Sequence, residues 1–267
     1  MADRTDADWD ALVQAKIFEV LSTAEMNVEA GPLASISTPA DPRFPLTIDH
    51  TLLKQDATPA QIDTLCDEAI KYGFKSCCVN GLYIKQVAER LKDSHSIACS
   101  VIGFPLGAGS AEAKAYEAQQ AIKDGALEID TVLPIGLLVA KPPQYKRIFD
   151  HLKVIVDAAS PVPVKVILET GLIPTPELKI AASFISAEAG AAFVKTSTGF
   201  AAGGATKADV SLMYQTVKYK GSVKVKASGG VRSFEACQEM FKAGAERIGT
   251  SSGVSLVQNS IPAAGCY

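Results

Sequence analysis

A repeated pattern along most of the chain limits the folds that this sequence can adopt. From residue 45 onward, each short apolar run is followed by a segment with helical periodicity, and several of these segments stop at a glycine. Short apolar runs without polar alternation are typical of strands that are buried on both faces. Eight such runs occur, at residues 47–53, 76–80, 97–104, 128–134, 164–170, 193–199, 224–230 and 247–253.

The helical segment after the first run shows both of its ends. Thr58 is suited to cap a helix and Pro59 to occupy the first helical position. Gly73 ends the segment, and Gly-Ala pairs at 125–126, 190–191 and 244–245 precede later runs, as expected for glycine in a left-handed helix cap. The apolar stripe between these ends consists of Ile62, Leu65, Cys66, Ala69 and Ile70.

Eight strand–helix units in about 210 residues match the size of a TIM (β/α)8 barrel, which is the fold we expect. A doubly wound open sheet is the alternative, but such a sheet usually carries GxGxxG after its first strand, and none follows residues 47–53. Residues 1–44 lack the repeat and predict one helix over residues 7–21. We therefore expect an N-terminal helical extension, 1–44, that packs on a catalytic barrel, 45–267, with a short C-terminal tail.

Composition excludes several classes of function. The net charge is −3 and no block of Lys and Arg occurs, so we expect neither nucleic acid nor an anionic membrane as a partner. The acidic N-terminus does not resemble a signal peptide, and the least polar stretch is too short and too rich in glycine to span a bilayer. The six cysteines include no CxxC pair and no histidine at zinc-ligand spacing. We therefore expect a reduced, cytoplasmic protein without a metal or other cofactor.

Lysines occupy positions in the later runs where a buried strand usually holds Val or Ile. Lys195 lies in FVKTSTG, and Lys224 and Lys226 lie in KVKASGG. Because consecutive strands lie about 4.8 Å apart, Lys195 and Lys226 could share the barrel lumen. Desolvation and like charge would both lower a lysine pKa there and favour the neutral amine that forms an imine with a carbonyl. Pairing with carboxylates, or extension of the lysines into solvent, is the alternative.

Asp130 is the carboxylate among apolar neighbours in EIDTVLP. Beside a lysine it could relay protons during imine chemistry, although a purely structural Lys–Asp pair is the alternative. Glycines and serines follow the last three runs, where barrels of this kind commonly hold a phosphate on backbone N–H groups and a short helix. The residues concerned are Gly199, Gly229, Gly230, Ser251 and Ser252, with Arg232 as a charged donor.

The segments IDHTLL, EIDTVLP, FVKTSTG, KVKASGGVR and RIGTSSG, in this order, resemble the deoxyribose-phosphate aldolases of the DeoC family. The resemblance implies a class I aldolase of deoxyribonucleotide catabolism that cleaves 2-deoxy-D-ribose 5-phosphate reversibly to acetaldehyde and D-glyceraldehyde 3-phosphate without metal. It implies that Lys195 is the Schiff-base lysine, that Lys226 lowers its pKa and that Asp130 relays protons. It also implies substrate contacts from Asp49, Thr51 and Thr198 and from the glycines, serines and arginine of the phosphate end.

One position departs from some relatives, which have lysine directly after KTSTG where this chain has Phe200. This change predicts weaker anion binding and broader acceptance of aldehydes without phosphate. Two alternatives to the aldolase stay open. One is another Schiff-base barrel, such as a transaldolase-like enzyme, and the other is a barrel that binds sugar phosphates without catalysis. A homo-oligomer, either dimer or tetramer, is also left open by the sequence.

The chain ends in Tyr267, and some members of the resembling family use a terminal tyrosine to protonate the enamine carbon. The seven residues after Ser260 can extend about 24 Å, which is enough to reach back over the mouth of a barrel. We predict that deletion of Tyr267 lowers kcat about 10²-fold, with little change in the free energy of unfolding. Slower exchange of acetaldehyde methyl protons with solvent should accompany the loss. A truncated enzyme with full turnover and full exchange would contradict this role.

Overall fold

Eight parallel strands close into a barrel in the order β1-β2-β3-β4-β5-β6-β7-β8, with β8 paired to β1. The structure is a computed structural model that describes residues 4–23 and 31–260. The strands are β1 (Ile48–Leu52), β2 (Ser76–Asn80), β3 (Ile97–Ile102), β4 (Glu128–Val132), β5 (Val164–Ile167), β6 (Phe193–Lys195), β7 (Lys224–Ser228) and β8 (Ala245–Thr250). This architecture confirms the predicted TIM barrel.

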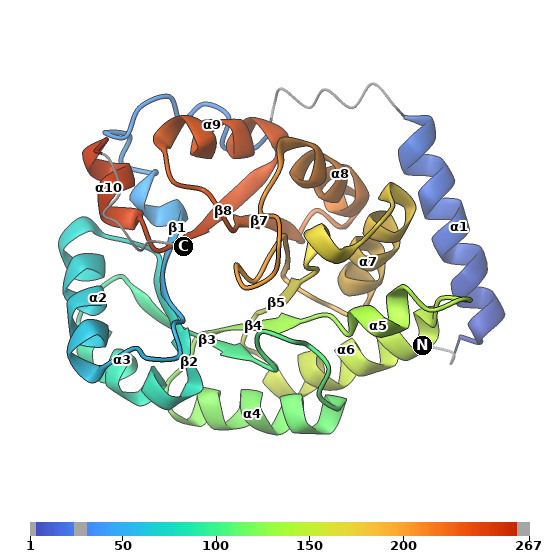
Figure 1. The fold of residues 1–267 in the computed structure, drawn as a ribbon, viewed down its shortest axis with the longest axis horizontal. Coiled ribbons are helices and arrows are strands. Elements are labelled where there is room, and N and C mark those ends of the chain that lie inside the picture. The colour runs from blue at the N-terminus through green and yellow to red at the C-terminus, as the bar shows by residue number, and fades with distance from the viewer. Residues whose placement is uncertain (1–3, 24–30, 261–267) are drawn as a thin grey trace.

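Helices follow the strands and form the outer ring that surrounds the barrel in Figure 1. They are α2 (Pro59–Tyr72), α3 (Ile84–Leu91), α4 (Ala111–Lys123), α5 (Ile135–Leu138), α6 (Tyr145–Ala159), α7 (Pro176–Glu188), α8 (Lys207–Val217), α9 (Phe234–Ala243) and α10 (Gly253–Gln258). Short 3-10 turns complete the connections: η1 (Pro45–Thr47), η2 (Gly81–Tyr83), η3 (Thr170–Leu172) and η4 (Lys218–Lys220).

The ends of α2 confirm the predicted helix signals. The Thr58 hydroxyl accepts a hydrogen bond from the Gln61 backbone N–H in a capping box, and Gly73 ends the helix in the left-handed conformation at φ +71°. The glycines at 125, 190 and 244 also have positive φ angles. The predicted apolar stripe was wrong at Ile70, which is 45% exposed because it lies beyond the face that packs on the barrel.

Several strands end earlier than predicted, and two of these ends matter for the site. The run at 193–199 continues as a strand only to Lys195, because Thr196 beyond it bonds to the last residue of β7 and Thr198 bonds to Glu169 after β5. Strand β8 begins at Ala245 and ends at Thr250 rather than spanning 247–253. There the Ser252 N–H donates to the Thr250 hydroxyl and turns the chain into α10. Both differences leave polar backbone groups at the carboxyl-terminal end of the barrel.

Most of the apolar core lies between the strands and the surrounding helices. A smaller cluster consists of Leu53, Cys78, Cys99 and Val101, with Phe104 packed against it. None of the helices within residues 4–23 and 31–260 has both the length and the apolar character that a membrane span requires.

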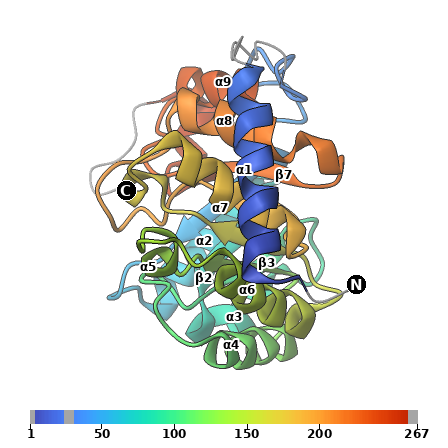
Figure 2. The same cartoon turned by 90° about the vertical axis from the view of Figure 1, so that its right-hand side faces the viewer.

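The N-terminal helix α1 (Asp6–Ser22) lies across the outside of α6, α7 and α8, as Figure 2 shows. It buries Trp9, Val13, Ile17 and Val20 in the same core that lines the barrel helices. The Trp9 ring lies 4.5 Å from the ring of Phe149 on α6, measured between centroids. These contacts agree with an extension that packs on the barrel, while the division into an extension and a catalytic domain stays a prediction.

Trp9→Ala should lower the free energy of unfolding by about 3–5 kcal/mol, because it empties a site in which the indole is only 1% exposed. Phe18→Ala is the matched control on the same helix, since Phe18 is 76% exposed and its removal should cost less than about 0.5 kcal/mol. Urea unfolding of both variants measures the difference. Equal stabilities would show that α1 does not dock on the barrel in solution.

Candidate active site

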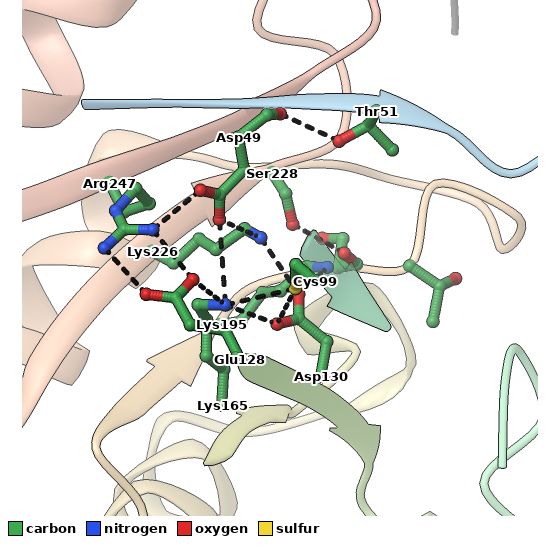
Figure 3. Close-up of polar contacts among 12 residues, drawn as sticks. Asp49, Thr51, Cys99, Glu128, Asp130, Lys165, Lys195, Lys226, Ser228 and Arg247 are labelled. Carbon is green, nitrogen blue, oxygen red and sulfur yellow. Dashed lines mark hydrogen bonds and ion pairs between the residues drawn. The ribbon is translucent and has the colours of Figure 1, made fainter. Parts of the chain in front are cut away.

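Charged side chains from six neighbouring strands meet inside the barrel (Figure 3). Alternate residues of a strand point to the same face, so Glu128 and Asp130, two residues apart on β4, both enter the lumen. The other strands contribute the remaining charges. The cluster consists of Asp49 (β1), Glu128 and Asp130 (β4), Lys165 (β5), Lys195 (β6), Lys226 (β7) and Arg247 (β8), all of them buried.

Asp130 is the centre of this cluster. Its Oδ1 accepts a hydrogen bond from Lys165 Nζ at 2.8 Å, and its Oδ2 accepts from Lys195 Nζ at 2.8 Å and from Lys226 Nζ at 2.9 Å. Burial alone would raise the pKa of Asp130, but the three ammonium groups outweigh burial and hold that pKa well below its usual range. Asp130 is therefore an anion that three lysines share.

Lys226 binds a second carboxylate, because its Nζ lies 2.5 Å from Asp49 Oδ2. Burial lowers the pKa of Lys226, but Asp130 and Asp49 together raise it above its ordinary value. The expectation that burial and like charge favour a neutral amine was therefore wrong for Lys226. The reason is that the lumen contains carboxylates for this lysine as well as a neighbouring lysine.

A deeper layer of ion pairs supports these groups. Arg247 Nη1 donates to Asp49 Oδ1 at 2.7 Å and to Glu128 Oε2 at 3.0 Å. Lys165 Nζ lies 2.6 Å from Glu128 Oε2, so it contacts both carboxylates of β4. The hydroxyl of Ser76 donates to Asp49 Oδ1 at 2.7 Å. Each carboxylate is thus fixed by at least two donors.

The cluster contains more cations than anions. Four basic side chains, Lys165, Lys195, Lys226 and Arg247, face three carboxylates, Asp49, Glu128 and Asp130. Lys165, Lys226 and Arg247 each contact two or more carboxylates, whereas Lys195 contacts only Asp130 among the carboxylates of residues 4–23 and 31–260. With every group ionised, one positive charge is uncompensated, and Lys195 is the cation with the weakest compensation.

The structure brings Lys195 and Lys226 together as the sequence predicted, since they are register partners on β6 and β7. It does not bring Lys224 into the lumen. Lys224 is exposed at the start of β7 and pairs with Glu246, with Nζ and Oε2 3.2 Å apart. Lys224 is the first residue of β7, at the amino-terminal end of the barrel, so it reaches solvent although it lies two residues from Lys226.

The predicted phosphate end lies at the carboxyl-terminal ends of β6, β7 and β8. Gly199, Gly229 and Gly230 all have positive φ angles there. The Ser252 hydroxyl is buried without a hydrogen-bond partner at the start of α10, and Ser251 is half-buried beside it. Arg232 follows β7 and is exposed to solvent. The structure thus places these residues at one end of the barrel.

Two threonines of the prediction bind protein groups in this structure. The Thr51 hydroxyl donates to the Asp49 carbonyl oxygen at 2.8 Å. Thr198 donates from both its N–H and its hydroxyl to the carboxylate of Glu169. Phe200 is 42% exposed, and its ring packs edge-on against Phe104 with centroids 5.2 Å apart. Tyr267 lies outside the described residues.

One group of side chains in the described part of the chain has the donor types of a metal site. Its members are Cys78, Cys99 and Asp130, whose ligand atoms all lie within 4.8 Å of one another. Both oxygens of Asp130 already accept from ammonium groups, and Cys99 Sγ lies 3.3 Å from Lys165 Nζ. A metal cation there would be repelled by three ammonium charges, so these residues fit a metal poorly.

The sequence analysis did not identify Lys165, Glu128 or Arg247. A signal for each was present, because Lys165 interrupts the apolar run VKVILET in the same way that Lys195 interrupts FVKTSTG. Glu128 precedes Asp130 by two residues and so shares its face of β4. Arg247 was missed because the predicted run began at residue 247, which made Arg247 the first residue of the strand. In the structure β8 begins at Ala245, so Arg247 lies inside the strand.

Comparison with known proteins gives one consistent result. Residues 44–261 match the model of the DeoC/LacD family of aldolases. The deoxyribose-phosphate aldolase of Staphylococcus carnosus is 53% identical over 211 residues, which cover 79% of this chain and 94% of that protein. The enzyme of the same name from Carboxydothermus hydrogenoformans is 52% identical over 218 residues, covering 80% of this chain and 93% of that protein.

Solved structures agree with the sequence comparison. A Coccidioides immitis protein described as a candidate deoxyribose-phosphate aldolase superposes with a TM-score of 0.87 at 37% identity, covering 97% of this chain and 99% of that one. The deoxyribose phosphate aldolase of Aeropyrum pernix, described as a tetramer, superposes with a TM-score of 0.75 at 33% identity, covering 87% and 96%. From its fold, its sequence and its buried lysine cluster, the chain belongs to the DeoC/LacD family of aldolases.

Proposed function

We propose that this aldolase cleaves 2-deoxy-D-ribose 5-phosphate reversibly to acetaldehyde and D-glyceraldehyde 3-phosphate through an imine on Lys195. The observation that supports the proposal is that Lys195 contacts fewer carboxylates than the other cations of the lumen do. An amine must lose its proton before it can attack a carbonyl. Loss of that proton from Lys195 balances the charge of the cluster and leaves every other cation with two carboxylates.

The reaction begins when Lys195 Nζ attacks C1 of the open-chain sugar. Water then leaves, and a protonated imine forms. A base removes the proton of the 3-hydroxyl, the C2–C3 bond breaks, and its electron pair passes to the imine as an enamine. Glyceraldehyde 3-phosphate departs at this step. Protonation of the enamine carbon and hydrolysis of the imine then release acetaldehyde and restore the amine.

Asp130 is positioned to manage the protons of this sequence. Its Oδ2 accepts hydrogen bonds from both Lys195 and Lys226. Asp130 can therefore accept a proton from Lys195 while Lys226 holds the carboxylate in place. A carboxylate beside the reacting nitrogen can relay protons to the substrate through water. Lys226 supplies a fixed positive charge that competes with Lys195 for the same carboxylate oxygen.

We also propose that the enzyme works in the cytoplasm, since the described cysteines Cys66, Cys77, Cys78, Cys99 and Cys237 form no disulfide. A dimer or a tetramer stays a prediction for this chain. The name of the Aeropyrum pernix enzyme describes a tetramer, and this resemblance supports a test by sedimentation of the purified protein.

Acetaldehyde with borohydride should add one ethyl group to Lys195, because reduction fixes the imine as a stable secondary amine. Peptide mass spectrometry locates the label. Lys195→Arg should abolish both labelling and turnover, since a guanidinium stays protonated and cannot attack. Lys224→Arg is the matched control on the exposed end of β7 and should retain both. Label on Lys226 would assign the nucleophile to the other lysine, and full turnover by Lys195→Arg would refute the mechanism.

Lys226→Leu should raise the pH at which imine formation is half-maximal, because Asp130 then holds the Lys195 ammonium without competition. The raised pKa of Lys226 means that its own stabilising charge is present below about pH 10.4 and is lost only as the pH rises through the folded value. In the wild type, Lys226 therefore stays charged between pH 6 and 9. A difference between the two trapping profiles in this range reports the missing charge of Lys226 and not its titration. An unchanged profile of trapping against pH would contradict the proposed competition.

A further inference from the structure

Glu169, two residues after the end of β5, has two unusual properties for an acidic residue. Its backbone is in the left-handed region at φ +57° and ψ +59°, and its side chain is only 3% exposed. A residue with a side chain pays about 1–2 kcal/mol to adopt this conformation. Such strain persists only where the surroundings hold the residue in place.

The carboxylate of Glu169 is bound by one residue of the β6–α8 loop. The backbone N–H of Thr198 donates to Oε1 at 3.2 Å and to Oε2 at 3.3 Å, and the Thr198 hydroxyl donates to Oε2. The same hydroxyl accepts a hydrogen bond from the Phe200 N–H at 3.1 Å. One buried carboxylate therefore fixes the turn from Thr198 through Gly199 to Phe200.

No lysine, arginine or histidine forms an ion pair with Glu169 within the described ranges 4–23 and 31–260. A buried carboxylate without a cation depends on hydrogen bonds for its stabilisation, and such charge-assisted bonds are about twice as strong as neutral ones. The contact with Thr198 is thus required for Glu169 to remain buried, and it fixes the loop in return.

The rest of the loop is held from both sides. On the β5 side, Gly171 lies so close to the loop that an added Cβ would be 2.3 Å from the Ala202 carbonyl oxygen. On the β7 side, the Thr196 hydroxyl donates to the Ser228 carbonyl oxygen at 2.8 Å, and the Ala205 N–H donates to the Gly229 carbonyl oxygen at 2.9 Å. The loop is therefore fixed between the turns that follow β5 and β7.

We propose that Glu169 is a positioning residue that sets the enzyme's preference for a phosphorylated substrate. Its carboxylate fixes the turn that presents Gly199 at the phosphate end of the barrel, beside the turn of Gly229. Thr198 links Glu169 to the Phe200 N–H in this arrangement. The N–H and the hydroxyl of Thr198 both donate to Glu169. The inference rests on the proposed function and adds a determinant of substrate preference to it.

Glu169→Gln and Thr198→Val test the proposal from the two ends of the same contact. The first replaces the carboxylate by a neutral amide, and the second removes the hydroxyl that links Glu169 to Phe200. Each should raise the KM for 2-deoxyribose 5-phosphate about tenfold while changing the KM for 2-deoxyribose less than about threefold. Thr198→Ser, which keeps the hydroxyl, should restore the KM for the phosphorylated sugar.

The double variant should be little worse than either single variant, because both act on the hydrogen bond between the Thr198 hydroxyl and Glu169. Glu177→Gln is the matched control, since it removes an exposed carboxylate from the first turn of α7 and should leave both KM values at wild-type levels. Thermal unfolding of each variant, with borohydride trapping of acetaldehyde, shows whether the fold and Lys195 remain intact.

Equal loss with both sugars would show that the contact is merely structural and would overturn the proposal. A lower KM for the phosphorylated sugar in Glu169→Gln would also overturn it, because the carboxylate would then act only by repelling phosphate. If the wild type traps acetaldehyde and the variants keep the wild-type ratio of the KM for 2-deoxyribose 5-phosphate to the KM for 2-deoxyribose, the inference alone fails. If the wild type traps no acetaldehyde, the proposed function fails and the inference fails with it.

Discussion

The sharing of Asp130 by three lysines is the interaction on which the rest of this site depends. A buried carboxylate and buried ammonium groups are each costly to take out of water, and they become tolerable only when they are paired with good geometry. Both Asp130 oxygens lie within 2.9 Å of lysine nitrogens, so the anion is fixed on each side. The same arrangement leaves Lys195 with this carboxylate as its one anionic contact in the described part of the chain. The proposed nucleophile is thus the least compensated cation of the cluster.

The closed barrel makes this arrangement possible. Strands β4 to β8 and β1 each direct alternate side chains inward, so seven charged groups from six strands meet without any long connection. Arg247 and Glu128 lie in the deeper part of the cluster and hold Asp49 and Lys165 in place. The apolar core lies between the strands and the outer helices and supplies the hydrophobic stability of the fold. The lumen can therefore hold charged side chains. The apolar core thus lies on the outer face of the sheet and the charged cluster on its inner face.

Loops at the carboxyl-terminal end of the barrel are fixed to the strands that carry the charged cluster. The loop after β6 begins directly at Lys195 and is tied to the turns after β5 and β7 by Glu169, Thr196 and Gly229. Lys195 and Gly199 of the predicted phosphate end are therefore parts of one fixed segment. A change in the backbone of that segment would move both, and Glu169, which has a positive φ angle, contacts the segment through Thr198.

The sequence by itself determined the eight strand–helix units, most strand positions, the adjacency of Lys195 and Lys226, and the membership of Asp130 in the same lumen. These features depend on local periodicity and on the order of strands, which are written in the chain. Tertiary structure alone decided that Lys165, Glu128 and Arg247 join the cluster, that Lys224 and Arg232 face solvent, and that Thr198 binds Glu169. It also decided the direction of the Lys226 pKa. The physical reason is that the direction, burial and partners of a side chain depend on the register between strands that are far apart in sequence. The pKa of a buried group in turn depends on all the charges around it.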